Sequence, residues 1–219
     1  MRKITAIEPQ KKNSQRVNVY LDGDFAFGLA RITAAWLRNG EELSEEKIAK
    51  LLDEDAKENA YKKALHFLSY RPRSSQEVRQ NLIKRGCNEA LVEAVIIQLQ
   101  NAGLVDDASF GQAWVENRST FRPRSKSVLR MELRKKGLDD AVIRSTLEDS
   151  VNEESLAWEA ARKQAHRYVK MDWPTFRQKL GGFLARRGFS YSVFAPVVSK
   201  VWKEIQMADT RSTSVNNKE

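Results

Sequence analysis

An internal repeat of 51 residues constrains this 219-residue chain more than any other feature of its sequence. The run Arg71-Pro72-Arg73-Ser74 recurs 51 residues later as Arg122-Pro123-Arg124-Ser125, and the same shift carries Pro123 to Pro174. Residues 82–86 map to 133–137 and then to 184–188, and each block begins with leucine and ends with glycine. Because proline, glycine and apolar positions recur in one gap-free register, the sequence predicts three copies of one module.

Each copy is predicted to form three helices. The apolar spacing indicates first helices over about 58–70, 107–120 and 154–169. The second helix begins just after the proline, with Ser74 and Glu77 as a capping box and Thr175 and Gln178 as another. The third helix follows a glycine and is apolar on one face. The buried i, i+4 pairs predicted for the second helices are Val78/Leu82, Leu129/Leu133 and Leu180/Leu184, and their glycine caps are Gly86, Gly137 and Gly188.

The first 56 residues have a different pattern. Alternating apolar residues flank Asp22-Gly23, which predicts a β-hairpin with a tight type I′ turn, and residues 4–7 add a possible third strand. A short helix is expected over residues 32–38, and a longer one starts at Ser44 and runs into the first module. Residues 207–219 are polar and lack periodicity, so a disordered tail is expected there.

The predicted fold is therefore mainly α: three tandem three-helix modules that form an elongated, curved array, preceded by a small β-hairpin or three-stranded element. The expected parts are the hairpin and linking helix at 1–56, the modules at 57–106, 107–153 and 154–206, and the tail at 207–219.

The repeat also assigns several single residues. Cys87 aligns with Leu138 and Phe189, so it is expected to be a small core residue after a glycine cap and not a nucleophile. His166 aligns with Ala64 and is expected to be partly buried, whereas His66 is expected at the surface. Trp114, Trp158 and Trp202 lie on apolar helix faces, which favours packing over base stacking.

Few residues could support catalysis. The sequence contains neither a Walker-type phosphate loop nor a G-x-G-x-x-G motif, and two histidines and one cysteine are too few for a typical zinc site. The pairs Asp106-Asp107 and Asp139-Asp140 stand at predicted helix starts, where carboxylates stabilise the helix dipole. We expect a binding protein, not an enzyme, with no cofactor and no metal. One cysteine, no secretory signal and no membrane-length apolar run predict a cytoplasmic protein without membrane contact.

The basic residues are unevenly spread. The formal net charge is +9, and residues 117–136 hold eight basic residues against the single acid Glu132. Lys126, Arg130 and Arg134 are spaced i, i+4, i+8 and predict one helical stripe that no acid neutralises. Such a surface favours a polyanionic or acidic partner. The candidate contact residues are Arg71, Arg73, Arg118, Arg122, Arg124, Lys126, Arg130, Arg134, Lys135, Lys136, Arg177, Lys179, Arg186 and Arg187.

Four sequence segments carry a family resemblance. The sequence at 64–74 (ALHFLSYRPRS) is similar to the first module of RecX regulatory proteins, and 103–110 (GLVDDASF) resembles the family's Gly-x-hydrophobic-Asp-Asp-x-x-Phe signature. Residues 132–138 (ELRKKGL) and 183–189 (FLARRGF) resemble the motifs of the second and third modules. The resemblance covers about residues 57–205. Gly111 departs from it, standing where the family usually has alanine.

The resemblance implies a regulatory protein in homologous recombination, DNA repair and the SOS response. RecX proteins bind the RecA–single-stranded DNA filament and restrain its growth, strand exchange, ATP hydrolysis and co-protease activity. The implied partners are the RecA filament and, through it, single-stranded DNA, and the expected state is a monomer. Two alternatives stay open: a sequence-independent DNA-binding protein or repressor built of helix-turn-helix-like units, and a structural adaptor that uses a groove between modules.

Overall fold

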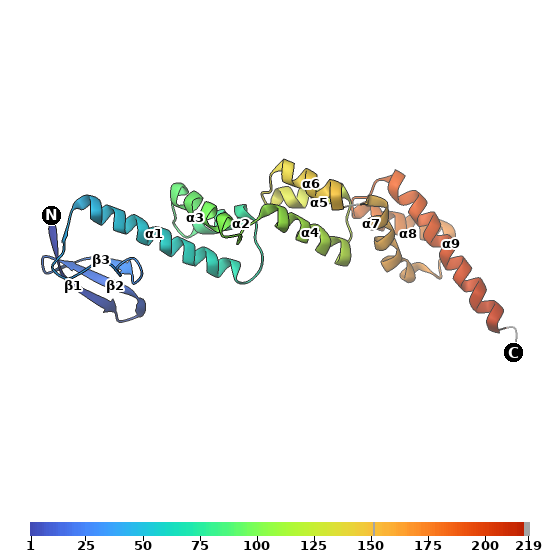
Figure 1. The fold of residues 1–219 in the computed structure, drawn as a ribbon. Coiled ribbons are helices and arrows are strands. Elements are labelled where there is room, and N and C mark those ends of the chain that lie inside the picture. Colours follow the sequence, from blue (N-terminus) through green and yellow to red (C-terminus); the bar gives the residue numbers. More distant parts are fainter. Residues whose placement is uncertain (151, 217–219) are drawn as a thin grey trace. The chain divides into compact units, whose positions relative to one another are not determined.

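The protein is described by a computed structural model, which covers residues 1–150 and 152–216 (Figure 1). It divides into two compact units, residues 1–105 and 106–219. The first unit contains a small sheet and one three-helix module, and the second contains two three-helix modules. The predicted mainly helical fold, with three three-helix modules after an N-terminal β element, is confirmed.

The N-terminal sheet is antiparallel throughout its described pairings and has the strand order β3-β2-β1-β4. Its strands are β1 (Arg2–Gln10), β2 (Asn13–Leu21), β3 (Asp24–Ala30) and β4 (Glu42–Leu43). Asp22 and Gly23 join β2 to β3 with φ values of 54° and 97°, as a type I′ turn requires. The predicted hairpin and third strand are therefore confirmed. Strand β4 was not predicted, because two residues are too few to show an alternating pattern.

Alternate residues of β2 build the core of this sheet. Val17, Val19 and Leu21 are buried together with Ile4 and Leu29 because successive side chains of a strand point to opposite faces. The expected helix over residues 32–38 is wrong. Residues 31–36 form turns, held by backbone hydrogen bonds from Ala34 to Ala30 and from Leu37 to Ala34, and this run is too short to continue as a helix.

Helix α1 (Glu45–Leu68) serves two cores in the first unit. Its first half places Ile48 and Leu51 against the sheet, and its second half places Ala60 and Ala64 in the module core with α2 (Ser75–Lys84) and α3 (Glu89–Asn101). The helix begins after Ser44, as predicted, because the Ser44 side chain accepts the Lys47 backbone N–H. The expected boundary between residues 56 and 57 thus lies inside one continuous helix.

A part-buried polar network fixes α1 to the sheet. Asp55, which is 6% exposed, accepts hydrogen bonds from the Arg16 guanidinium, with a closest N···O distance of 2.9 Å. Asp55 also accepts the Ala30 backbone N–H and an Asn59 side-chain N–H. Arg16 in turn donates to the Gly28 carbonyl at 2.9 Å. The network joins β2, β3 and α1, and it lies outside the repeat, so the repeat does not predict it.

The second unit contains α4 (Asp107–Phe121), α5 (Lys126–Lys135), α6 (Asp140–Ser150), α7 (Glu153–Ala165), the 3-10 helix η1 (His166–Tyr168), α8 (Trp173–Arg186) and α9 (Tyr191–Asn216). The predicted i, i+4 pairs of all three second helices are fully buried, at 0% exposure. One continuous core runs through both modules of this unit, from Phe110 to Val201. The second and third modules therefore share one hydrophobic core.

The glycine caps are as predicted. Gly86, Gly137 and Gly188 have φ values of 85°, 79° and 89°, which an L side chain rarely adopts. The backbone N–H groups of Cys87, Leu138 and Phe189 each bond back across their glycine to the leucine carbonyl five residues earlier. Cys87 packs partly buried against the first module's core, in agreement with its predicted structural role.

The third copy departs from the gap-free register. Ala161 and Ala165 are buried where a shift of 51 residues would place Arg162 and His166, and His166 is exposed, so its predicted burial is wrong. The second helix also starts early: Asp172 caps α8 by accepting the Thr175 N–H, so the Thr175/Gln178 capping box is wrong. The turn of η1 accommodates the one-residue offset.

The last helix continues past the residue at which a tail was expected. Helix α9 extends to Asn216, and residues 217–219 lie outside the described residues. The prediction of a disordered tail from residue 207 therefore differs from the structure over residues 207–216. Once the packed first turns of α9 have formed, each added residue needs only one more backbone bond to extend the helix, even without apolar periodicity.

Candidate functional site

The fourteen predicted contact residues lie in both units. Arg71 and Arg73 belong to the first unit, and the other twelve belong to the second. Their side chains fall into three groups: those paired with a carboxylate, those held over an aromatic ring, and those without a carboxylate partner. This division, which sequence could not supply, decides which charges remain to meet a partner.

Glu132 of α5 gathers the first group. Its Oε2 atom accepts hydrogen bonds from Arg118 Nε and Trp114 Nε1, both at 2.9 Å, and its Oε1 atom lies 2.8 Å from Arg124 Nη1. The Arg118 guanidinium also stacks 4.4 Å from the centre of the Trp114 ring. Glu132 thereby holds α4, α5 and the segment between them together. Sequence showed Glu132 only as a single acid among basic residues and did not predict these three contacts.

Opposing effects act on the Glu132 carboxyl. Its burial raises the pKa, but hydrogen bonds from Arg118 and Trp114 and the charges of Arg118 and Arg124 outweigh burial and hold the pKa below its usual 4.5. The carboxylate is therefore stabilised in its charged form. It offsets much of the charge of both arginines, which are less available to an external anion as a result.

Two further arginines are ion-paired. Arg134 Nε lies 2.8 Å from Asp140 Oδ1, at the start of α6, and Arg71 makes two hydrogen bonds to Glu77, at 2.9 and 3.1 Å. The expectation that no acid neutralises the Lys126–Arg130–Arg134 stripe and its entry is wrong, because Asp140 pairs with Arg134 and Glu132 pairs with Arg124. Asp140 is six residues from Arg134 in sequence, on the next helix, so i, i+4 spacing does not predict this pair.

Aromatic rings hold three more cations. The Arg73 guanidinium lies 4.0 Å from the centre of the Phe67 ring, Lys136 Nζ lies 4.8 Å from that of Trp114, and Arg187 lies 4.9 Å from that of Phe183. A ring face attracts a cation without cancelling its charge. The Arg73 and Arg187 guanidinium groups are therefore oriented but keep their positive charge.

The remaining cations make no ion pair within residues 1–150 and 152–216. On α5, Lys126 and Arg130 are one turn apart on the exposed side of the buried Leu129/Leu133 edge. In the third module, Arg177 donates to the Tyr191 hydroxyl at 3.0 Å. The cations without a carboxylate partner are Arg122, Lys126, Arg130, Lys135, Arg177, Lys179 and Arg186.

The structure brings Arg122, Arg124 and Arg187 together where the second and third modules meet. Arg187 Nη1 donates to the Pro123 carbonyl at 3.3 Å, and the Arg187 carbonyl accepts the Ser125 backbone N–H at 3.2 Å. Burial lowers the pKa of Arg187, and the nearby charges of Arg124 and Arg122 lower it further. Three like charges thus lie close together at this junction.

Three tryptophans and one histidine lie as their positions in the repeat predict. Trp114, Trp158 and Trp202 are partly buried against the core of the second unit, as expected, and His66 is exposed, as expected. Among the described residues no cluster of three or more histidine, cysteine or acidic side chains is arranged to hold a metal. No helix in the described part of the chain is long and apolar enough to cross a membrane.

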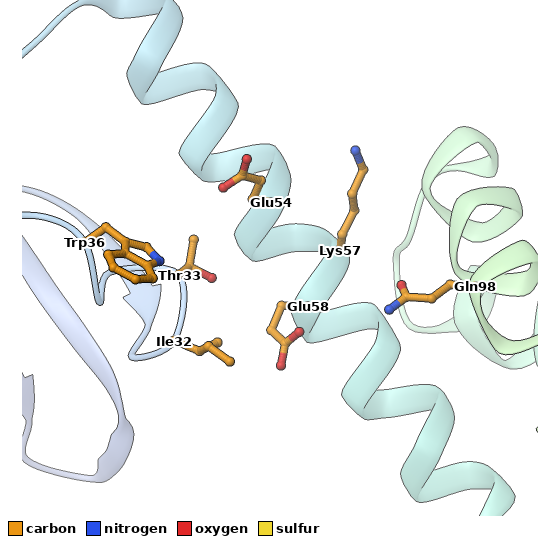
Figure 2. Close-up of a pocket in the computed structure, with 7 residues that line it drawn as sticks. All are labelled: Ile32, Thr33, Trp36, Glu54, Lys57, Glu58 and Gln98. Carbon is orange, nitrogen blue, oxygen red and sulfur yellow. The ribbon is translucent and has the colours of Figure 1, made fainter. Parts of the chain in front are cut away.

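One surface feature of the first unit was not anticipated. Trp36 is 88% exposed and Ile32 is 66% exposed, and they face α1 across an open hollow of about 340 Å³ (Figure 2). Figure 2 shows Glu54 and Glu58 of α1 on the other side of this hollow, with Gln98 of α3 beside them. The exposure follows from the turn at 31–36, which buries Ala34 and directs Trp36 outward.

Sequence models of one family match four segments of the chain. These are the regulatory protein RecX N-terminal domain at residues 2–44 and the first, second and third RecX three-helix domains at 60–99, 106–147 and 152–198. A regulatory protein RecX from Leuconostoc mesenteroides is 33% identical over 208 residues, which span 93% of this chain and 78% of that protein. One from Bacillus licheniformis is 32% identical over 203 residues, or 90% and 76%.

Solved structures agree with these relatives. A crystal structure of regulatory protein RecX is 30% identical and superposes with a TM-score of 0.70, covering 90% of this chain and 98% of the other. RecX from Lactobacillus salivarius, at 24% identity and a TM-score of 0.59, covers 67% of this chain and 96% of its own and supports the fold alone.

Proposed function

Because this chain belongs to the RecX family of regulatory proteins, we propose that it binds the filament that RecA forms on single-stranded DNA and inhibits filament growth. The rates of strand exchange, ATP hydrolysis and co-protease activity by RecA would decrease because less filament is present. A ligand shifts a conformational equilibrium only by its differential affinity for the two states. The protein would therefore favour a filament arrangement that does not extend.

The observation that carries this proposal is the set of unpaired cations in the second unit. Lys126 and Arg130 on α5, and Arg122 at the end of α4, have no carboxylate partner within the described ranges. They stand on a frame that Glu132 and the shared core hold rigid. A rigid, unpaired positive surface suits DNA phosphates or an acidic protein face, because little conformational freedom is lost on binding.

The family is one of regulatory proteins and is not known as an enzyme family. We propose accordingly that the chain acts by binding and needs neither cofactor nor metal. We further propose that it acts as a monomer in the cytoplasm, where its filament partner assembles. Its three modules would end near residues 106, 153 and 206.

The alternative of a tandem helix-turn-helix repressor has less support. Such a protein would present a similar recognition surface on each second helix. The positions of Lys126, Arg130 and Arg134 are occupied in the first module by Ser75, Arg79 and Ile83, of which Ser75 is buried and Arg79 is bonded to Glu93. The stripe therefore occurs once, which does not fit a repeated reader of DNA sequence.

A comparison of two ligands tests the proposal. The affinity for bare single-stranded DNA and for the same DNA coated with RecA would be measured at one salt concentration. We expect tighter binding to the coated DNA, together with slower ATP hydrolysis by RecA. Equal affinity for both ligands without any effect on ATP hydrolysis would contradict the proposal and favour a plain DNA-binding protein.

A further inference from the structure

An exposed aromatic side chain lies at the positive junction of the second unit. Phe121 ends α4 and is 72% exposed, and Arg122 follows it directly. Lys163 Nζ donates to the carbonyl just before it, that of Thr120, and Arg187 Nη1 donates to the carbonyl of Pro123 at 3.3 Å. Two cations from the third module are thus anchored to the backbone on either side of the ring.

Two of the arginines at this junction have no carboxylate partner in the described part of the chain. Arg124 shares Glu132 with Arg118, whereas Arg122 and Arg187 have no carboxylate partner within the described part of the chain. The charges of Arg124 and Arg122 act on the partly buried Arg187. Crowded like charges are unfavourable in the free protein, so a bound anion would relieve their repulsion.

We propose that Phe121, Arg122, Lys163 and Arg187 form a contact for single-stranded nucleic acid, in which the Phe121 ring stacks on an unpaired base and the cations meet the flanking phosphates. This inference rests on the proposed function and specifies its DNA-contacting part. An aromatic face beside a positive track is the usual chemistry of sequence-independent single-strand binding, because every base has a stacking face. A duplex keeps its bases stacked on one another and offers the ring no such face.

The first module contains the same element in a closed form. Tyr70-Arg71-Pro72-Arg73-Ser74 corresponds to Phe121-Arg122-Pro123-Arg124-Ser125. Tyr70 is 71% exposed, but its hydroxyl bonds to His66 at 3.2 Å and its ring meets the His66 ring edge-on at 5.2 Å. Arg71 is held by Glu77 through two hydrogen bonds, and Arg73 lies over Phe67.

One position accounts for much of this difference. Glu77, which binds Arg71, corresponds to Val128 in the second module, so Arg122 has no matching carboxylate. The chain therefore carries an internal control: the same aromatic-Arg-Pro-Arg-Ser run, neutralised in one copy and open in the other. Its Tyr70 and Arg71 should contribute little to DNA binding.

The test measures binding of the intact protein, without RecA, to labelled oligo(dT) and to a duplex of equal length across a salt series. Phe121→Leu should lower the affinity for oligo(dT) about tenfold and leave both the salt slope and the duplex affinity unchanged, because a neutral stacking contact is lost. Arg122→Gln should flatten the log–log salt slope on oligo(dT) by about 0.7. The matched control Tyr70→Leu should bind both ligands as the wild type does.

A gain-of-contact variant strengthens the test. Glu77→Gln frees Arg71 and keeps the length of the side chain, so the salt slope on oligo(dT) should steepen by up to about 0.7. Melting temperatures show whether each variant is folded, and a second substitution, Phe121→Ser, replaces Phe121→Leu if the latter is not.

Two outcomes would overturn the inference. Phe121→Leu could bind oligo(dT) as the wild type does, or it could lose affinity for oligo(dT) and for the duplex equally. The first of these, with inhibition of RecA intact, leaves the proposed function standing. A wild type that binds oligo(dT) through Phe121 but never inhibits RecA supports this contact and contradicts the proposed function.

Discussion

At the scale of single residues, glycine caps that look equivalent in sequence have different surroundings. Gly86 and Gly188 both have positive φ, at 85° and 89°. A Cβ on Gly86 would meet no atom within 4 Å, whereas a Cβ on Gly188 would lie 2.4 Å from Val128 Cγ2 and 2.5 Å from Ser125 Oγ. Gly188 is therefore required by its own backbone and also by the approach of α5, a contact between modules that local sequence does not reveal.

This pair predicts unequal costs for the same substitution. Gly86→Ala should lower the free energy of unfolding by about 1 kcal/mol, which is the cost of a left-handed conformation with a Cβ. Gly188→Ala should lower it by about 1–3 kcal/mol more, because the second module must shift to admit the methyl group. Urea unfolding followed by circular dichroism measures both. Equal losses in the two variants would show that the junction relaxes freely.

Glu132 gives a pH-dependent prediction. Its folded-state pKa is lowered, so its stabilising contribution is present above the ordinary value of 4.5 and is lost as the pH falls through the lower, folded value. The wild type should therefore be more stable than Glu132→Gln at pH 7, and the difference should shrink below pH 4.5. Melting temperatures of both proteins at a series of pH values measure this. A constant difference down to the lowest pH would contradict the ion-paired assignment.

At the scale of elements, local signals predicted helices well and predicted their partners poorly. The buried pairs of the second helices followed from i, i+4 spacing, and the Asp22-Gly23 turn followed from its residues. The start of α8 did not follow, because the repeat register pointed to Thr175 while Asp172, one turn earlier, makes the cap. The pairs Arg134–Asp140 and Arg16–Asp55 were not predicted for a different reason: each pair joins two elements whose relative position local sequence does not give.

The docking of α1 on the sheet is open to a direct test. Asp55→Ala removes the carboxylate that Arg16, Asn59 and the Ala30 N–H share, and it leaves the part-buried Arg16 charge without its partner. The free energy of unfolding should fall by about 3 kcal/mol, within the range for breaking one side of a buried pair. The double variant Arg16→Met/Asp55→Leu should recover much of that loss. A single variant as stable as the wild type would show that the network is not structural.

At the scale of the whole molecule, the three repeats do not form three equal cores. The first module has its own core, while a single core spans α4 to α9. The sequence could predict three modules because the repeat is explicit. It could not predict that two of them share one core, to which Phe176 contributes in the place of Ser74 and Ser125, because this residue differs between the copies.

The shared core predicts cooperative unfolding of the second unit. Phe176 is completely buried, and Phe176→Ala should cost about 3–5 kcal/mol. Amide hydrogen exchange should then accelerate in α4 and α5 as well as in α8, whereas α2 and α3 should keep their protection. Faster exchange confined to α7–α9 would show that the second module is stable without the third.

The candidate site could likewise be predicted from the sequence only in part. Sequence identified the basic residues but could not separate the neutralised charges from the free ones, since Glu132 serves Arg118 and Arg124 across two helices and a turn. Sequence did not identify Phe121 as a contact residue, because its exposure depends on where α4 ends and α5 begins.

The central claim, that unpaired cations of the second unit bind the RecA filament on DNA, is tested most directly by inhibition of RecA ATP hydrolysis on single-stranded DNA across a salt series. The double variant Lys126→Gln/Arg130→Gln is compared with the wild type and with Arg79→Gln, which removes a charge at the position of Arg130 in the first module, where Glu93 already neutralises it. We predict that the double variant has the melting temperature of the wild type. On the order of ten times more of it should be needed for half-inhibition, and its inhibition should depend less steeply on salt. Arg79→Gln should inhibit as the wild type does. Full inhibition by the double variant at wild-type concentrations would contradict the account.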